Sequence, residues 1–271
     1  MNSQPQLHDP LSGVVVVVLA DFLRQHQGWG WLRLVAGSAP YKDVPGLTSV
    51  KVMGSGHGGG FSLRPSATHQ GLICTFTHFD LAMKFLGSSW VQAYRDRARE
   101  LWAGVLSVQS ARGHWDKQAW LATAPDALAD PVDAQGLFAV LTRASIVPTK
   151  TMAFWRYAPA AQAGLGQSEG CLLSMGLGEA PLVRQCTFSL WQHQAAMLQY
   201  AHQGAHQLAS AAAYKHQFFS ESMFVRMQVL HTSGVWQGRV FDAPKTAARD
   251  DSAASTREPV VGLHALEPSH V

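Results

Sequence analysis

The sequence predicts an α+β fold in which two ferredoxin-like units follow one another and form a barrel of the dimeric α+β type. An internal repeat is the first observation, because Cys-Thr-Phe stands at residues 74–76 and again at 186–188. A second is that each half alternates strand-like and helix-like stretches in the order β-α-β-β-α-β. Further partial matches in the same order pair 52–56 with 174–178 and 113–115 with 234–236. Two copies of one unit are expected to pack together, with a ligand pocket where they meet.

The first unit is expected at residues 12–116. A valine-rich strand is predicted at 14–21, followed by a short helix at 24–34 that Gly28 and Gly30 weaken. Further strands are predicted at 45–53, 70–78 and 105–115, and helices at 82–86 and 91–102. Cys74 and Cys186 are expected at equivalent positions in corresponding strands, as small buried hydrophobic residues.

The second unit is expected at residues 136–237, after a linker at 121–135 rich in Ala, Asp and Pro. Its strands are predicted at 137–146, 171–176, 183–191 and 223–231, and its helices at 150–157 and 194–213. The helix at 194–213 has the strongest helical pattern in the chain. From 241 to 271 the composition turns to Ala, Asp, Ser and Pro, which predicts a disordered tail.

Composition and spacing argue against several classes of protein. The net charge is +3 and no run of Lys or Arg occurs, so no nucleic-acid partner is predicted. The three cysteines lack CxxC spacing, which argues against a zinc cluster or a disulfide framework. The apolar run at 14–19 is too short to span a bilayer and lacks a basic leader, so we predict a cytoplasmic protein. Peripheral contact with a membrane stays open at this point.

The glycine-rich segment 54–59 reads Gly-Ser-Gly-His-Gly-Gly and has the spacing of a dinucleotide fingerprint. That fingerprint requires a helix directly after the glycines, and Pro65 opposes a helix there. A tight loop is the better interpretation.

His202 and His206 lie four residues apart on the strongest predicted helix and therefore share one face. Three interpretations stay open: an exposed pair, two ligands of a zinc site, or one axial ligand to a planar metal cofactor. An axial imidazole needs apolar walls and a partner for its second nitrogen. Glu221 is a candidate partner, and the candidate walls are Phe218, Phe219, Phe224 and Met227.

Several strings of the chain, spread over residues 12–237, resemble the spheroidene monooxygenase family of carotenoid biosynthesis. They are Gly54-Ser55-Gly56, Gly60-Phe61, Arg64-Pro65, Leu141-Thr142-Arg143-Ala144, Phe154-Trp155, Gly176-Leu177-Gly178-Glu179-Ala180-Pro181 and Thr187-Phe188-Ser189-Leu190-Trp191. The resemblance implies an oxygenase that binds haem b and inserts oxygen at an acyclic carotenoid carbon, giving hydroxy and then keto products. It also implies O₂ as cosubstrate and an electron donor such as ferredoxin.

The family pattern near the predicted long helix matches His206, Phe218-Phe219, Glu221, Phe224 and Arg226. The resemblance thus implies His206 as the axial iron ligand, with Glu221 orienting its imidazole. Phe219 and Phe224 are expected against the haem. Arg143 and Arg184 are expected at the haem propionates or at the distal side, with Arg143 and Glu221 as the catalytic candidates. The chain departs from the pattern at Ala205 and Ser222, where the family has Pro and a second acid.

Three functions follow from these observations. The first is a haem monooxygenase acting on a small apolar substrate such as an acyclic carotenoid. The second keeps haem but changes the reaction, as in aldoxime dehydration, dismutation of a small oxidant or N–O rearrangement. A carrier of haem or of another hydrophobic ligand, without catalysis, is the third. Both a monomer and a homo-oligomer are compatible with a barrel of two fused units.

Overall fold

A computed structural model describes residues 12–119, 136–180, 182–201, 212–213 and 215–242 of the chain. The first half contains β1 (Ser12–Phe22), α1 (Gln27–Ala36), β2 (Leu47–Gly56), β3 (Pro65–His78), α2 (Phe79–Leu86), α3 (Ser89–Arg95) and β4 (Ala98–Gly113). The second half contains β5 (Phe138–Ile146), α4 (Thr151–Gly166), β6 (Cys171–Ala180), β7 (Arg184–Trp191), α5 (Gln194–Ala201) and β8 (Phe219–Gly234). No helix in this described part is long and apolar enough to cross a membrane.

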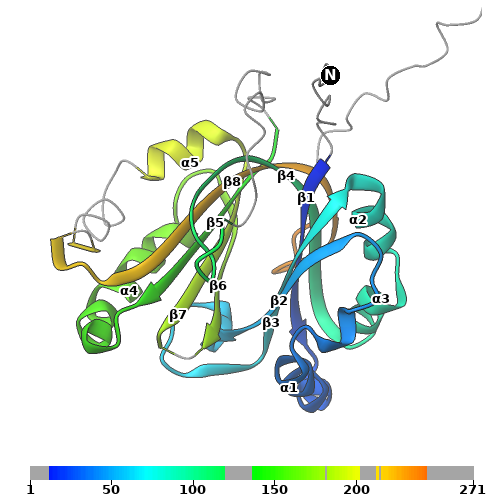
Figure 1. Ribbon diagram of the computed structural model, residues 1–271, viewed down its shortest axis with the longest axis horizontal. Coiled ribbons are helices and arrows are strands. Elements are labelled where there is room, and N and C mark those ends of the chain that lie inside the picture. The colour runs from blue at the N-terminus through cyan, green and yellow to red at the C-terminus, as the bar shows by residue number, and fades with distance from the viewer. Residues whose placement is uncertain (1–11, 120–135, 181, 202–211, 214, 243–271) are drawn as a thin grey trace, which may run out of the picture.

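The eight strands form one closed antiparallel barrel, which confirms the predicted α+β barrel (Figure 1). Around the barrel the order is β1-β3-β2-β6-β7-β5-β8-β4. The first half therefore contributes β4-β1-β3-β2, and the second contributes β8-β5-β7-β6. When the four strands of each half are numbered in chain order, both halves have the spatial order 4-1-3-2. Because a barrel leaves no open sheet edge, all eight strands are paired on both sides.

The two halves meet along two unequal seams. Strands β4 and β8 pair over a long stretch, from Trp102 with Gly234 to Gly113 with Met223. The β2–β6 seam is short and pairs only Gly54 with Gly178. The hydroxyl of Ser55 strengthens this second seam by donating a 2.5 Å hydrogen bond to the carbonyl of Gly176.

The structure confirms one of the predicted helices of the first half and shortens another. The stretch at 24–34 does form a helix, α1, and Gly30 fits because a side chain there would collide with Phe22 and Gln70. The predicted helix at 91–102 is wrong beyond Arg95, because β4 already begins at Ala98. Residues 101–106 are buried by barrel pairing, which overrides the helical charge pattern.

The repeated Cys-Thr-Phe marks corresponding strands, β3 and β7, but not equivalent positions. Cys74 points outward and packs with Phe85 beneath α2 and α3. Cys186 points into the barrel and packs with Phe188. The prediction that the cysteines are equivalent is therefore wrong, since a shift of one residue places a side chain on the other face of a strand. Both are buried as expected, and burial raises the pKa of each thiol.

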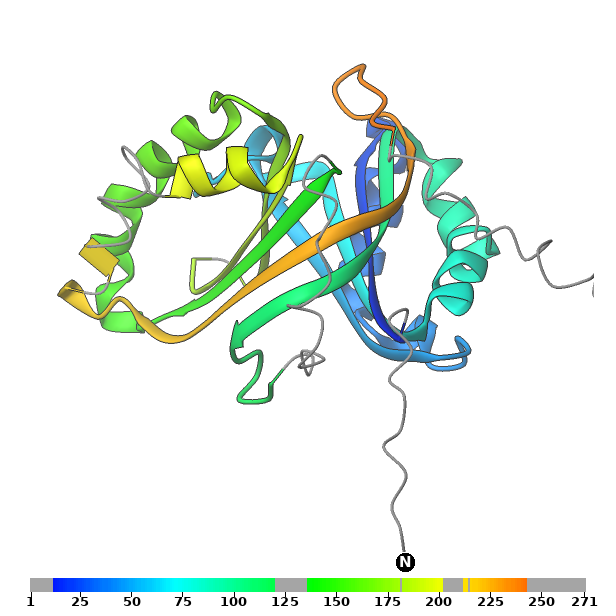
Figure 2. The ribbon, with the colours of Figure 1, turned by 90° about the horizontal axis from the view of Figure 1, so that it is seen from above.

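Side chains from both halves fill the barrel interior, and a tryptophan turn closes each end. Trp115 follows β4 and Trp236 follows β8, and both rings are buried in the barrel core. Figure 2 shows the two turns at opposite ends of the barrel. Phe241 packs into the same core, so the part of the predicted tail that the structure describes is ordered.

The two tryptophan turns are held by the same contacts at the same spacing along the chain. Glu221, near the start of β8, accepts hydrogen bonds from the backbone N–H groups of Asp116 and Lys117, at 3.1 and 2.6 Å. Glu100, near the start of β4, accepts them from the N–H groups of Gln237 and Gly238, at 2.7 and 2.8 Å. Each half of the chain thus binds the closing turn of the other, as the match of 113–115 with 234–236 indicates.

Candidate functional site

Six charged side chains meet at the barrel end that Trp115 closes, and we call them the ion cluster. They come from six different segments, and three cations balance three carboxylates. The members are Lys51, Asp116, Arg143, Glu179, Arg184 and Glu221. The cluster brings together three residues that the sequence analysis selected from separate strings: Arg143, Arg184 and Glu221.

Arg143 is the centre of the cluster and its side chain is only 1% exposed. It projects from β5 on the inner face of the barrel, the same face as the core residues Ala139 and Leu141. Its guanidinium pairs directly with Glu221 and lies 3.4 Å from Glu179 and 3.5 Å from Asp116. The guanidinium also lies over the Trp115 ring, 5.7 Å from its centroid. Such a buried cation depends on the carboxylates around it, because desolvation alone would expel the charge.

The remaining members connect the cluster to the rim. The ammonium of Lys51 lies 2.6 Å from Asp116 and 3.4 Å from Glu179, which joins β2 to β6 across the short seam. The Lys51 hydrogen bond is the main reason that the pKa of Asp116 lies below its usual value. Arg184 is half exposed and lies 3.4 Å from Asp116. The indole N–H of Trp115 donates to Glu179 at 3.1 Å.

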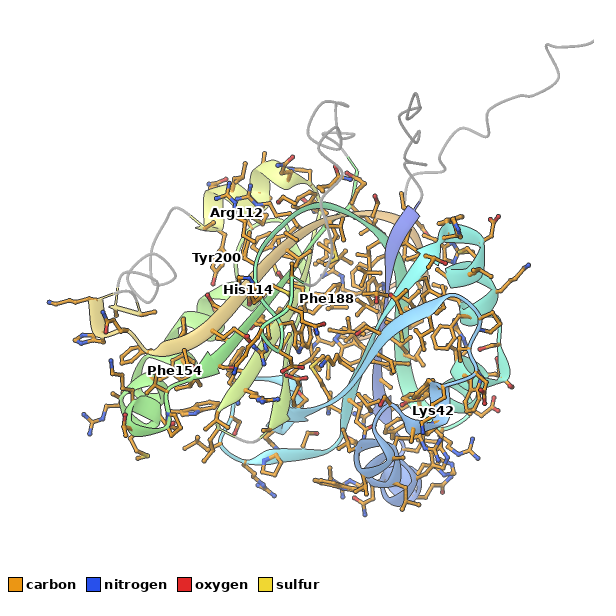
Figure 3. The ribbon with its side chains drawn as sticks, in the orientation of Figure 1. Lys42, Arg112, His114, Phe154, Phe188 and Tyr200 are labelled. Atoms are coloured by element: carbon orange, nitrogen blue, oxygen red, sulfur yellow. The ribbon has the colours of Figure 1, made fainter. Side chains whose placement is uncertain are left out.

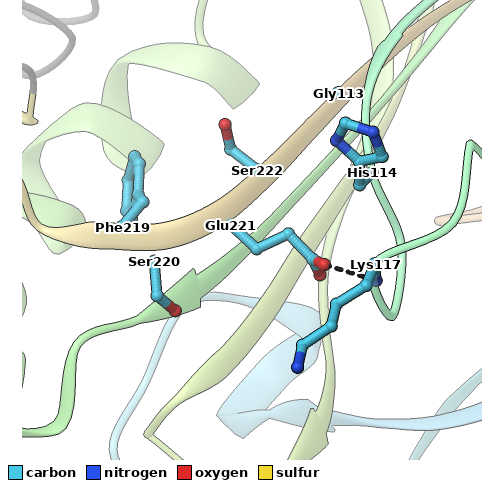
Figure 4. A pocket seen from close by; sticks show the side chains of 7 residues that line it. All are labelled: Gly113, His114, Lys117, Phe219, Ser220, Glu221 and Ser222. Atoms are coloured by element: carbon cyan, nitrogen blue, oxygen red, sulfur yellow. Dashed lines mark hydrogen bonds between the residues drawn. The ribbon is translucent and has the colours of Figure 1, made fainter.

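A pocket of about 560 Å³ opens beside the cluster, between the start of β8 and the turn after β4. Figure 4 shows His114 and Lys117 on one side and the segment Phe219–Ser222 on the other. Its lining is largely polar, with the Glu221 carboxylate at its edge. This lining matches an apolar substrate poorly, since polar groups lose their hydration when such a molecule covers them.

The outer face of the second half, beneath α4 and α5, differs from the outer face of the first. In the first half, buried side chains of α2 and α3 pack against β1, β3 and β4. In the second half the corresponding described layer is smaller, and Thr142 and Phe224 on the same face stay only partly buried. We call this region the outer layer.

Aromatic side chains line the outer layer. Phe154 of α4 contacts the rings of Phe218 and Phe219, with centroids 6.2 and 5.8 Å apart. Tyr200 of α5 packs on Trp191, with centroids 5.4 Å apart. Burial raises the pKa of Tyr200 to about 12, so its hydroxyl stays protonated at neutral pH. These rings give the layer an apolar lining that excludes water.

Two arginines also face the outer layer, from neighbouring positions of β8 and β4. Arg226 follows Phe224 by two residues and lies over its ring, 5.4 Å from the centroid. Its Nε is buried and has no hydrogen-bond partner among the described residues. Arg112 pairs with Phe224 across the two strands. Burial and the nearby Arg112 charge lower the pKa of the Arg226 guanidinium. No ion pair joins either arginine to an acid within the described residues, so this pair is suited to an anionic group.

Figure 3 separates the two regions, with Phe188 inside the barrel and Arg112 and Tyr200 on the side of α5. The predicted residues divide between them. Arg143, Arg184 and Glu221 belong to the ion cluster on the inner face, whereas Phe219 and Phe224 belong to the outer layer. His206 lies outside the described residues, five positions after Ala201, the last described residue of α5. In the part that is described, no group of three or more His, Cys, Asp or Glu forms a metal site.

Comparison with known proteins decides the family. A spheroidene monooxygenase of Rubrivivax gelatinosus is 47% identical over 227 residues, which cover 83% of this chain and 86% of that protein. The Rhodobacter capsulatus spheroidene monooxygenase is 31% identical over 82% of this chain and 92% of its own length. The chain belongs to the spheroidene monooxygenase family. No protein-family model matches it.

Among solved structures, an aldoxime dehydratase superposes on this member of the spheroidene monooxygenase family with a TM-score of 0.52. The identity is 9%, and the match covers 83% of each chain. A second aldoxime dehydratase, crystallised with butyraldoxime, gives a TM-score of 0.52 at 8% identity, covering 82% of this chain and 80% of its own. At such identities the likeness concerns the fold alone.

The structure adds two arginines to the candidate residues. Arg226 was matched to the family pattern but given no role, and Arg112 was not selected at all. The sequence does indicate where the Arg226 side chain lies. Arg226 is two residues from Phe224, and in a strand this spacing places both side chains on one face. Arg112 becomes visible only when β4 and β8 are paired.

Proposed function

We propose that this protein is a haem-dependent monooxygenase that inserts oxygen into a C–H bond of an acyclic carotenoid. The observation that carries the proposal is the 47% identity to a spheroidene monooxygenase along 83% of the chain. The overall reaction uses one O₂, two electrons and two protons, and yields the hydroxylated substrate and one water. A donor such as ferredoxin would supply the electrons one at a time.

The outer layer is the proposed place of the haem and of the substrate. Haem requires apolar walls and cations for two carboxylates, and the outer layer supplies aromatic rings and two arginines without an acid partner among the described residues. When bound, haem supplies an iron at which O₂ is activated. Phe219 and Phe224 would hold the macrocycle and exclude water from the site.

Arg226 and Arg112 are proposed as the partners of the two propionates. This assignment takes the place of Arg143 and Arg184, which lie on the opposite face of the sheet and pair with carboxylates of the chain. Glu221 is proposed to hold the Trp115 turn and Arg143 rather than an imidazole, because its two oxygens accept both N–H groups of that turn. Arg143 and Glu221 would then act on stability and not on the reaction.

His206 remains the proposed axial ligand, and its replacement tests the haem assignment directly. His206→Ala is expected to lose the Soret band of protein purified with haem available, because the proposed iron ligand would be missing. His202→Ala is the matched control, from the same helical pattern, and should keep the band. Equal Soret bands in both variants would contradict the assignment.

Arg226→Ala is expected to weaken haem binding by about 10-fold, the usual worth of one charge-assisted hydrogen bond. Haem affinity is measured by titration of the haem-free protein and followed by absorbance. Arg184→Ala serves as the control and should leave the affinity unchanged. A loss in Arg184→Ala with none in Arg226→Ala would place the propionates at the ion cluster instead.

Turnover tests the function itself. The purified protein, reduced by ferredoxin and supplied with O₂, is expected to convert an acyclic carotenoid into a hydroxylated and then a keto product. Incorporation of ¹⁸O from labelled O₂, followed by mass spectrometry, is the measurement. A hydroxylated product whose oxygen comes from water, or turnover without O₂, would refute a monooxygenase.

We also infer that the two halves are ferredoxin-like units that arose by duplication. The matching strand orders and the reciprocal contacts of Glu100 and Glu221 support this inference. The cytoplasmic location and the oligomeric state stay predictions.

A further inference from the structure

Exposed apolar side chains of the described part gather on a few segments. Ten large hydrophobic residues are exposed, and seven of them lie on four segments: 23–44, 57–64, 147–156 and 182–184. The seven are Leu23, Trp31, Leu32, Val35, Leu63, Met152 and Leu182. In Figure 1 α1, the light-blue connection between β2 and β3, the turn between β6 and β7 and the start of α4 lie along the lower edge of the molecule. We call this the lower surface.

Helix α1 supplies the most exposed part of the lower surface. Trp31, Leu32 and Val35 are 45%, 63% and 85% exposed and share one face of the helix. Gly30, on another face of the helix, is buried against Phe22 and Gln70 of the barrel. An amphipathic helix usually turns its apolar face inward, so a second apolar face directed to solvent indicates a contact outside the chain.

The other three segments form one packed unit on the second half. Phe61, from the β2–β3 connection, packs on Trp155 of α4 with centroids 6.2 Å apart. The indole N–H of Trp155 donates to the carbonyl of Leu182 at 3.0 Å. Leu63, Met152 and Leu182 project from this unit and are 61%, 74% and 40% exposed.

Leu182 is held in an unusual backbone conformation, with a φ of 68°. Glycine or asparagine ordinarily occupies such a position, because the left-handed region costs other residues about 1 kcal/mol or more. The turn thus holds an exposed leucine where a polar or small residue would stabilise the fold. Strain of this kind is usually kept where the side chain has a function.

The same segments are strongly basic. Together they carry seven Lys and Arg residues and one acid, whereas the whole chain has 21 and 18. Five of these cations are exposed: Arg24, Lys42, Arg64, Arg156 and Arg184. Apolar side chains surrounded by cations match the interface of an anionic bilayer, where the former enter the acyl region and the latter meet lipid phosphates.

We propose that the lower surface docks on an anionic lipid bilayer as a peripheral membrane contact. Helix α1 and the tips Leu63, Met152 and Leu182 enter the interface, and the exposed arginines and lysine bind the headgroups. Helix α4 belongs to this surface and also covers the outer layer. If the proposed function holds, an apolar substrate dissolved in the bilayer would therefore reach the outer layer without crossing water.

Vesicle flotation tests the docking. The full-length protein is expected to float with vesicles of phosphatidylcholine and phosphatidylglycerol, and to bind vesicles of phosphatidylcholine alone far less. The double variant Leu32→Glu/Val35→Glu should reduce the bound fraction on the order of 10-fold, because it places two anions at the interface. Val240→Glu is the matched control, because Val240 is 64% exposed but lies outside the four segments; it should bind like the natural protein.

Several outcomes would overturn the proposal. Absence of flotation with anionic vesicles is one, and equal flotation of the double variant and the natural protein is another. A dimer in sedimentation velocity that dissociates in the double variant, without vesicle binding, would show that a second copy covers the surface. Melting temperatures of all variants must agree, so that unfolding does not mimic lost binding. Because flotation needs neither haem nor turnover, its result is independent of the proposed reaction.

Discussion

Arg143→Met is expected to lower the free energy of unfolding by about 3 to 5 kcal/mol, the usual cost of removing one partner from a buried ion pair. Methionine retains much of the volume of the side chain but leaves Glu221 and Glu179 in the barrel end without the central cation. The carboxylates would then repel one another in a site that water reaches poorly. Urea denaturation at neutral pH measures the loss.

Arg184→Met is the matched control for this prediction. Arg184 belongs to the same ion cluster, but its side chain is 48% exposed, and among the described residues its one ion pair is with Asp116. Its loss should cost less than about 1 kcal/mol, as for other exposed ion pairs. Adding Glu221→Gln to Arg143→Met should restore part of the stability, because it removes one unpaired charge. If the two arginine variants lower the free energy of unfolding equally, the buried Arg143 ion pairs do not stabilise this end of the barrel.

Gly113→Ala and Gly234→Ala are expected to destabilise the protein by similar amounts, at least ~3 kcal/mol each. The two glycines begin the tryptophan turns and have φ angles of 85° and 92°. A Cβ on Gly113 would overlap the carbonyl of Ser222, and one on Gly234 would overlap the carbonyl of Leu101. Each clash involves backbone within the long β4–β8 seam, which cannot move aside without losing strand pairing.

Gly58→Ala is the control that separates the cost of a left-handed backbone conformation from the cost of a steric clash. Gly58 has a φ of 66°, but a Cβ at this position would meet no other atom within 4 Å. Its replacement should cost only about 1 kcal/mol, the penalty of the left-handed conformation alone. Thermal melts of the three variants provide the comparison. Similar melting temperatures for all three would mean that the turns can shift, and that the barrel ends are not closed as tightly as the contacts indicate.

The repeat in the sequence was a reliable guide to strand order but not to side-chain direction. The match of 113–115 with 234–236 corresponds to two turns with the same hydrogen bonds. The match of the Cys-Thr-Phe strings, by contrast, joins an outward Cys74 to an inward Cys186. Short identities tolerate a shift of one residue, whereas the face of a strand does not.

For the candidate residues too, the sequence indicated which residues to consider but not which face of the sheet they occupy. Phe219 and Phe224 lie in the outer layer, where an aromatic lining was expected. Arg143, Arg184 and Glu221 were selected from family strings and are indeed brought together, but on the inner face and in contact with one another. Their partners Lys51 and Asp116 lie far away in the sequence, and no motif or spacing singled them out.

The sequence by itself determined the alternation of elements, the barrel and the family, because strand and helix periodicity and family strings are local properties of the chain. Tertiary structure alone decided which face each side chain occupies and which charges meet. Arg143 forms its buried ion pair only because β5 lies between β7 and β8, which brings Glu221 to its guanidinium. Arg112 joins Arg226 only because β4 pairs with β8. Pairing between strands far apart in sequence sets these contacts, and no local pattern encodes it.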